Sequence, residues 1–136
     1  MTTVKNWSET DATVSLHDNH NRDVLDPSPD EIVSVINNLG ISPDSEEFDF
    51  VIMHVKESFL GKNITLQTIT ERGSGSYIVE SLIFTDMETD TPTKEAFRLT
   101  TTNVNEVSRL FCDFSSGTVP NISTWDDVSD EVFPKS

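Results

Sequence analysis

The stretch that decides the fold runs from Asn103 to Trp125 and reads NVNEVSRLFCDFSSGTVPNISTW. Apolar residues recur along it at helical spacing, namely Val104, Val107, Leu110, Phe111 and Phe114. Side chains three or four positions apart lie on one face of a helix, so this spacing predicts an amphipathic helix. Such a helix must bury its apolar stripe, and the layer that it covers is expected upstream in the chain.

The ends of this helix are also marked in the sequence. Asn103 is a favourable N-cap, and Glu106 three residues later is placed to complete a capping box. Gly117 stands just past the last periodic residue, where a left-handed C-cap favours a residue without a Cβ atom. Pro120 then predicts a turn, and we expect Trp125 to fold back onto the same core.

A second helix is predicted from the segment PSPDEIVSVINNLG at residues 27–40. Ser28 is the expected N-cap, Pro29 the first helical residue and Glu31 the third residue of a capping box. The apolar stripe then consists of Ile32, Val33, Ile36 and Leu39. Gly40 is expected to end this helix.

Between residues 48 and 101 the apolar residues recur with period two, which is typical of β-strands. The first strand starts at Phe48 and is apolar on both faces, so it is predicted to lie centrally in the sheet. Further strands are expected at residues 64–69, 77–84 and 94–100, after a turn at Gly61–Asn63, a loop at 72–76 and an acidic loop at 85–93. The short connections predict antiparallel pairing.

These elements predict an α+β fold in a single domain that spans residues 1–136. An antiparallel sheet of four or more strands carries the C-terminal amphipathic helix on one face. The helix of the N-terminal half is expected either beside it or on the other face. Residues 1–26 are expected to hold poorly defined strands, at 2–8 and 12–16, and a polar loop, whereas residues 129–136 form a polar tail.

The chain is strongly acidic, with 24 Asp and Glu residues against 9 Lys and Arg, for a formal net charge of −15. This charge argues against binding nucleic acid through its phosphates and favours a basic partner. Cys112 is the only cysteine, which excludes an internal disulfide and is typical of a reducing compartment. Neither a membrane-length apolar run nor a signal peptide is recognisable, so we expect a cytoplasmic protein that does not enter membranes.

The sequence offers little for catalysis or metal binding. Cys112 lies inside the predicted helix with no histidine near it, as expected for a structural thiol. His17 and His20 have a metal-like spacing but no third ligand on a rigid element. Asp86, Glu88 and Asp90 alternate as in a calcium loop, but they lack its glycine and its closing glutamate. We therefore expect no enzymatic activity, no metal and no cofactor.

Residues 99–128, LTTTNVNEVSRLFCDFSSGTVPNISTWDDV, resemble the closing segment of the first immunity-protein family of bacterial polymorphic toxin systems. That segment has a Val- and Phe-rich helix, a small residue before Gly, a Pro, and a Trp before an acidic residue. The matching residues here are Val107, Leu110, Phe111, Phe114, Ser116, Gly117, Pro120, Trp125 and Asp126. The resemblance extends over residues 27–128 and is loose around Arg72–Ser76, where the family has a Gly-rich turn.

The resemblance implies a protein that binds and neutralises one secreted effector toxin, similar to a nuclease or a nucleic-acid deaminase. Such a toxin carries a basic cleft, which acidic side chains can occupy in place of phosphates. The residues expected to bind it are Asp86, Met87, Glu88, Asp90, Asp126, Asp127, Asp130 and Glu131. The free protein is expected to be a monomer. The alternatives are an acidic DNA mimic that inhibits a defence system, a secretion adaptor or chaperone with exposed apolar grooves, and a small-molecule-binding or enzymatic domain.

Overall fold

A seven-stranded antiparallel sheet forms the scaffold in a computed structural model that describes residues 14–19, 23–41, 45–55, 62–85, 90–91 and 93–134. The strands are β1 (Val14–Asp18), β2 (Asp23–Leu25), β3 (Phe48–Val55), β4 (Lys62–Glu71), β5 (Tyr77–Thr85), β6 (Thr93–Thr101) and β7 (Asp126–Asp127). Their order in the sheet is β2-β1-β3-β4-β5-β6-β7. The helices are α1 (Pro29–Asn37), α2 (Val104–Ser115) and α3 (Ser129–Val132). The expected α+β class is confirmed.

The register of the strands aligns one set of side chains beneath the helices. Met53 of β3 lies opposite Leu66 of β4 and Leu16 of β1, and all three are fully buried. Successive residues of a strand point to opposite faces, so every second residue joins this core. The alternation therefore divides the sheet into a face covered by helices and a second face.

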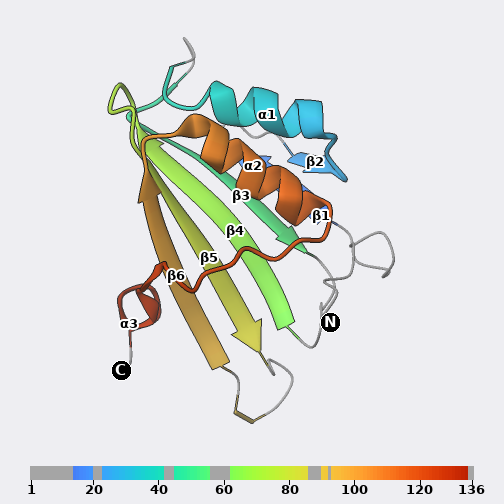
Figure 1. The fold of residues 1–136 in the computed structure, drawn as a ribbon, viewed down its shortest axis with the longest axis vertical. Coiled ribbons are helices and arrows are strands. Elements are labelled where there is room, and N and C mark those ends of the chain that lie inside the picture. Colours follow the sequence, from blue (N-terminus) through green and yellow to red (C-terminus); the bar gives the residue numbers. More distant parts are fainter. Residues whose placement is uncertain are drawn as a thin grey trace.

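Helices α1 and α2 lie side by side on the same face of the sheet, as Figure 1 shows. Phe111 and Phe114 of α2 are fully buried, as are Ile32 and Ile36 of α1. Trp125 is partly buried and packs against this core, as expected. Of the two arrangements expected for the N-terminal helix, the structure has the one in which it lies beside α2.

The predicted caps are right for α1 and partly wrong for α2. The Ser28 hydroxyl accepts from the Glu31 N–H, and the Glu31 carboxylate accepts from the Ser28 N–H, so the α1 capping box is complete. In α2 the Asn103 side chain accepts instead from the N–H of Asn105, two residues on, and the expected box with Glu106 does not form. Gly117 has a φ of 108°, as its position after the helix requires.

Two short strands, β2 and β7, are not predicted by the sequence pattern. The segment at 17–23 was expected to be an irregular polar run, yet β1 continues to Asp18 and β2 begins at Asp23. β7 pairs with β6 through Asp127 and Phe97. β4 begins at Lys62, inside the predicted turn. The strand expected at 2–8 lies outside the described residues, as do residues 56–61.

The last described residues differ from the expected polar tail. Ser129–Val132 form α3, which packs against β6. The ring of Phe133 meets that of Phe84 edge-on at 5.6 Å between centroids, and the Lys94 ammonium lies 5.9 Å from the Phe133 ring centre. Residues 129–134 are therefore part of the folded domain. Among the helices of the described residues, none is long and apolar enough to cross a membrane.

Candidate protein-binding surface

The face of the sheet opposite α1 and α2 exposes apolar side chains. We call the surface formed by Phe48, Phe50, Ile52, Gln67, Ile69 and Ile78 the open face. Phe48 is 48% exposed, and Ile69 and Ile78 are each 37% exposed. Of the described elements, α3 is the one that reaches across this side of the sheet, and its contacts are with β5 and β6 at the margin of the open face. Apolar groups of this size are usually buried, so their clustering indicates a binding surface.

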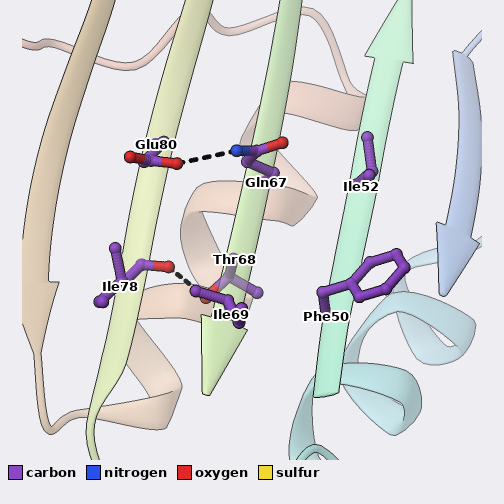
Figure 2. A pocket seen from close by; sticks show the side chains of 7 residues that line it. All are labelled: Phe50, Ile52, Gln67, Thr68, Ile69, Ile78 and Glu80. Carbon is purple, nitrogen blue, oxygen red and sulfur yellow. Dashed lines mark hydrogen bonds between the residues drawn. The ribbon is translucent and has the colours of Figure 1, made fainter. Parts of the chain in front are cut away.

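The open face is hollowed at its centre. A depression of ≈ 240 Å³ is lined by Phe50, Ile52, Gln67, Thr68, Ile69, Ile78 and Glu80. Figure 2 shows these side chains on three neighbouring strands, β3, β4 and β5. A second hollow next to it is lined by Phe48, Ile69, Glu71, Ser74, Ser76 and Ile78. The two hollows share Ile69 and Ile78, so they form one continuous apolar strip.

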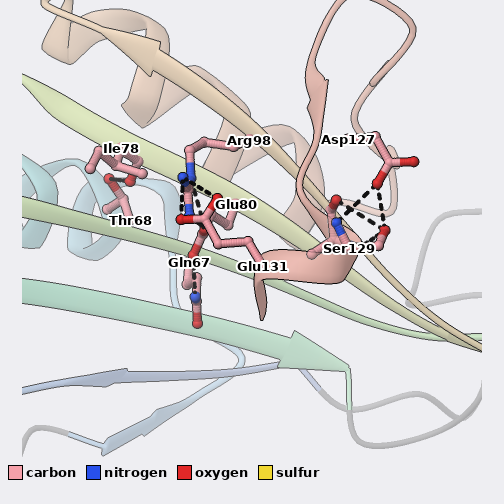
Figure 3. A network of polar contacts seen from close by, with 9 residues as sticks. Gln67, Thr68, Ile78, Glu80, Arg98, Asp127, Ser129 and Glu131 are labelled. Atoms are coloured by element: carbon pink, nitrogen blue, oxygen red, sulfur yellow. Dashed lines mark hydrogen bonds and ion pairs between the residues drawn. The ribbon is translucent and has the colours of Figure 1, made fainter. Parts of the chain in front are cut away.

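A network of charged side chains borders this strip (Figure 3). Gln67 Nε2 donates to Glu80 Oε1 at 2.8 Å, and Arg98 Nη2 donates to Glu80 Oε2 at 2.7 Å. Arg98 Nε also donates to Glu80 Oε2, at 2.9 Å, and Arg98 Nη1 donates to Glu131 Oε1 at 3.1 Å. The hydrogen bond between Arg98 and Glu80 raises the pKa of Arg98 above its ordinary value, although partial desolvation of the guanidinium opposes this. The only cation of this network is thus shared between two carboxylates.

The acidic residues expected at the C-terminal end lie together on the outer edge of the sheet. Asp126 and Asp127 form β7, and Asp130 and Glu131 belong to α3; all four are exposed. Asp127 Oδ1 accepts from the Ser129 hydroxyl at 2.6 Å and from its N–H at 2.9 Å, and these two bonds lower the pKa of Asp127. Asp126 and Asp130 project from the same edge, so we call these four residues the acidic edge.

The structure tests only part of the acidic loop that was expected to bind. Asp90 is exposed, whereas Asp86, Met87 and Glu88 lie outside the described residues. Whether the loop joins the acidic edge in one surface therefore stays a prediction.

The cysteine and the histidines considered for catalysis or metal binding lie in surroundings that are typical of structural residues. The Cys112 sulfur lies 3.9 Å from the Pro29 carbonyl, and burial together with nearby Asp113 raises the pKa of the thiol, which disfavours a nucleophilic thiolate. The rings of His17 and His54 are stacked at 5.2 Å. His17 Nδ1 also lies 3.3 Å from a carboxylate oxygen of Asp23. In the described part of the chain, no group of three or more His, Cys, Asp or Glu side chains is placed to hold a metal ion.

The open face was not predicted from the sequence, although the apolar residues on both faces of β3 indicate it. The apolar residues on both faces of β3 were taken to indicate a strand buried on both sides. β3 is indeed internal, but the described helices α1 and α2 share one face, and Phe48 and Ile69 are left exposed on the other. Comparisons with models of protein families, with curated proteins and with solved structures returned no match to this chain.

Proposed function

We propose that this chain is a cytoplasmic immunity protein that binds one cognate secreted bacterial toxin and neutralises it. The observation that supports this proposal is the net charge of −15 together with the exposed acidic edge. The toxin would be a nuclease or a nucleic-acid deaminase, as the sequence resemblance implies. Inhibition would require tight binding and no chemistry by the inhibitor.

The physical basis is competition for a basic cleft. An enzyme that acts on nucleic acid must present Lys and Arg side chains to phosphate groups. Asp126 and Asp130 carry carboxylates on a folded edge, and such groups form short charge-assisted hydrogen bonds with those same cations. Complementary charge also speeds the encounter of the two proteins, which favours an inhibitor that must act before damage occurs.

The first test begins with a search of the neighbouring genes for a secreted protein that ends in a toxin domain, and it uses that domain. Co-expression of the chain should restore growth of cells that produce this domain, and the two purified proteins should bind with an affinity that falls as salt is added. Failure of the chain both to bind the toxin domain and to rescue growth would overturn the proposed function. A bound complex in which the toxin stays fully active would contradict neutralisation.

The acidic edge predicts a specific variant. Replacing Asp126 and Asp130 by Lys should lower the affinity for the toxin domain at least tenfold, because two attractive charges become repulsive. Asp127 and Glu131 are kept because they bond Ser129 and Arg98. The matched control replaces Glu47 and Asp113, two other exposed carboxylates, by Lys. It changes the net charge equally, so equal losses in both variants would indicate an effect of overall charge alone.

The loop is tested separately. Replacing Asp86, Glu88 and Asp90 by Lys should weaken binding further if the loop and the acidic edge contact the same partner. Unchanged affinity in this variant would remove the loop from the binding surface.

A second candidate function is favoured by the open face. A secretion adaptor or chaperone holds an apolar segment of its cargo, and exposed Phe48, Ile69 and Ile78 offer such a surface. An adaptor would bind an unfolded segment of the effector and leave the folded toxin active. An immunity protein binds the folded toxin and abolishes its activity. The same toxin assay therefore separates the two.

A further inference from the structure

The open face combines exposed apolar groups with an acidic border. Carboxylates on its side of the sheet include Glu71 at the end of β4, Glu80 on β5, Asp23 on β2, Asp126 on β7 and Glu131 on α3. Glu71 lines the same hollow as Phe48 and Ile69. In the free protein water hydrates these carboxylates well, whereas exposure of the apolar strip to water is unfavourable. A partner that fills the strip and brings cations to its border would bury the apolar groups and keep the carboxylates paired.

The described cations neutralise this border only in part. Lys and Arg side chains that the structure describes are Arg72, Lys94, Arg98 and Arg109. Arg98 is held between Glu80 and Glu131, and Arg72 donates to the Ser45 carbonyl at 3.0 Å. Lys94 stands over the Phe133 ring and lies opposite Phe84, at the other end of β6 from the residue that pairs with Ile78. An occupant that carries cations could therefore still pair with the exposed carboxylate of Glu71.

A second copy of the chain is a poor occupant for the same reason. Two chains with a net charge of −15 each repel one another, and pairing two open faces would place like-charged borders together. A basic protein surface with an apolar centre has the opposite property. Its apolar side chains would fill the strip, and its Lys and Arg side chains would ring Glu71 and Glu131.

Gln67 adds a polar contact at the bottom of the main hollow. Its amide nitrogen is committed to Glu80, so its amide oxygen points away from that bond and toward the β3 side of the hollow (Figure 2). An amide oxygen only accepts hydrogen bonds. A Lys, Arg or backbone N–H donor from the partner would meet it beside Ile52, which adds selectivity for a donor-bearing surface.

The dimensions of the sheet suit a protein partner. Strands lie about 4.8 Å apart and rise about 3.3 Å per residue, so the area between β1 and β6 is roughly 20 Å by 25 Å. Stable complexes bury about 800 Å² on each partner. The open face with its acidic border approaches that scale, whereas its main hollow alone would hold only a few side chains of a partner.

We propose that the open face is the docking surface for the apolar centre of the basic toxin domain. The inference rests on the proposed function and adds a second, apolar contact to the electrostatic one. The acidic edge and the acidic border orient the toxin as it approaches. Burial of Ile69 and Ile78 against its apolar centre then stabilises the complex. Salt should therefore weaken association more than it speeds dissociation.

The test is a pair of strand-compatible substitutions, Ile69→Thr with Ile78→Thr, in the full chain. Thr keeps the β-branch that strands favour and removes the apolar contact. Affinity for the toxin domain used in the first test should fall at least tenfold, through faster dissociation. The matched control is Val33→Thr on α1, because Val33 has a nearly equal exposed fraction of 38% but lies on the helix side. It should leave affinity within twofold.

A second measurement requires no substitution and covers the case in which the double variant fails to fold. In NMR spectra of the unmodified chain, the methyl signals of Ile52, Ile69 and Ile78 should shift when the toxin domain is added. Ile41, which is 73% exposed and follows α1, should not change. Shifts confined to residues away from the open face would overturn the inference.

The outcomes separate the two proposals. If the unmodified chain does not bind the toxin domain, the proposed function fails. If it binds and the Ile69, Ile78 variant binds equally well, only the docking inference fails. If the unmodified chain sediments as a dimer that the variant dissociates, the occupant is a second copy and the inference is overturned. Binding of only the unfolded toxin segment would overturn it in favour of an adaptor.

Discussion

Asp49 illustrates how one residue ties together distant parts of the chain. Its side chain is 1% exposed, and it accepts hydrogen bonds from the Gly40 N–H at 2.8 Å, the Asn19 amide at 3.0 Å and the Glu46 N–H at 3.1 Å. Gly40 has a φ of 74°, and a Cβ atom there would stand 3.2 Å from the Thr70 methyl. The carboxylate thus fixes the end of α1 against β1 and the start of β3.

The pKa of Asp49 predicts an acid-sensitive contribution to stability. Burial desolvates the carboxylate and raises its pKa, but the hydrogen bonds from Gly40, Ser45, Asn19 and Glu46 together outweigh burial and lower it from 3.8 to about 2. A carboxyl group with a depressed folded-state pKa stabilises the fold above its unfolded value. The contribution, roughly 2–3 kcal/mol, is complete above pH 4 and is lost as the pH falls from about 4 to 2.

The substitution Asp49→Asn tests this contribution. At pH 7 it should lower the free energy of unfolding in urea by roughly 2–3 kcal/mol, because the amide cannot replace the charge that the donors face. The difference from the unmodified chain should shrink near pH 2.5. Asp113→Asn, at an exposed site on α2, should change stability by less than about 0.5 kcal/mol. A deficit that stays constant with pH would contradict the role of ionisation.

At the scale of elements, local signals identified some elements and missed others. α1 was predictable because Ser28, Pro29 and Glu31 form a complete capping signal within four positions. α2 was predictable because its stripe spans three turns. β2 and β7, with three and two residues, are too short to show a period, and they exist because neighbouring strands offer backbone partners. The burial of Asp49 could not be predicted either, because its donors Asn19 and Gly40 lie far from it in sequence.

The site was less predictable than the fold, for a physical reason. The charge of the acidic edge could be predicted from the residues between Asp126 and Glu131, because Asp and Glu side chains are mostly exposed in folded proteins. The open face could not, because the sequence pattern shows that β3 has two apolar faces but not which face the helices cover. That choice depends on packing between α1 and α2, which lie more than sixty residues apart. Ile69 and Ile78 looked like core residues until both helices were placed.

Helix α3 has one anchor that can be removed on its own. Phe133→Ala should release α3 from β5, since an edge-on aromatic pair contributes about 0.5–1.5 kcal/mol beyond burial. Hydrogen exchange of the Val132 amide, which donates to the Val128 carbonyl, should become faster, while the amides of β4 should stay protected. Phe48→Ala serves as the control, because this exposed ring lies on the same face as Phe84 but at the other end of β4, opposite Glu71 rather than Asn63. Uniformly faster exchange across the sheet would show that α3 supports the whole fold.

For the whole molecule, the excess of carboxylates predicts opposite effects of salt on folding and on binding. The folded chain concentrates a net charge of −15, and this self-repulsion favours unfolding. Added salt screens it, because the Debye length falls from about 30 Å at 0.01 M to about 10 Å at 0.1 M. Raising NaCl over that range should therefore increase the melting temperature, by roughly 2–8 °C for each kcal/mol of stabilisation.

Binding to a basic toxin should respond in the other direction, because the same ions screen an attraction between the partners. Calorimetric unfolding and titration with the toxin domain, carried out across one series of NaCl concentrations, measure the two trends together. The variant with Lys at 126 and 130 carries less net charge, so both of its slopes should be shallower. A melting temperature that falls with salt would contradict charge repulsion within the fold, and an affinity that rises with salt would contradict charge attraction to a basic partner.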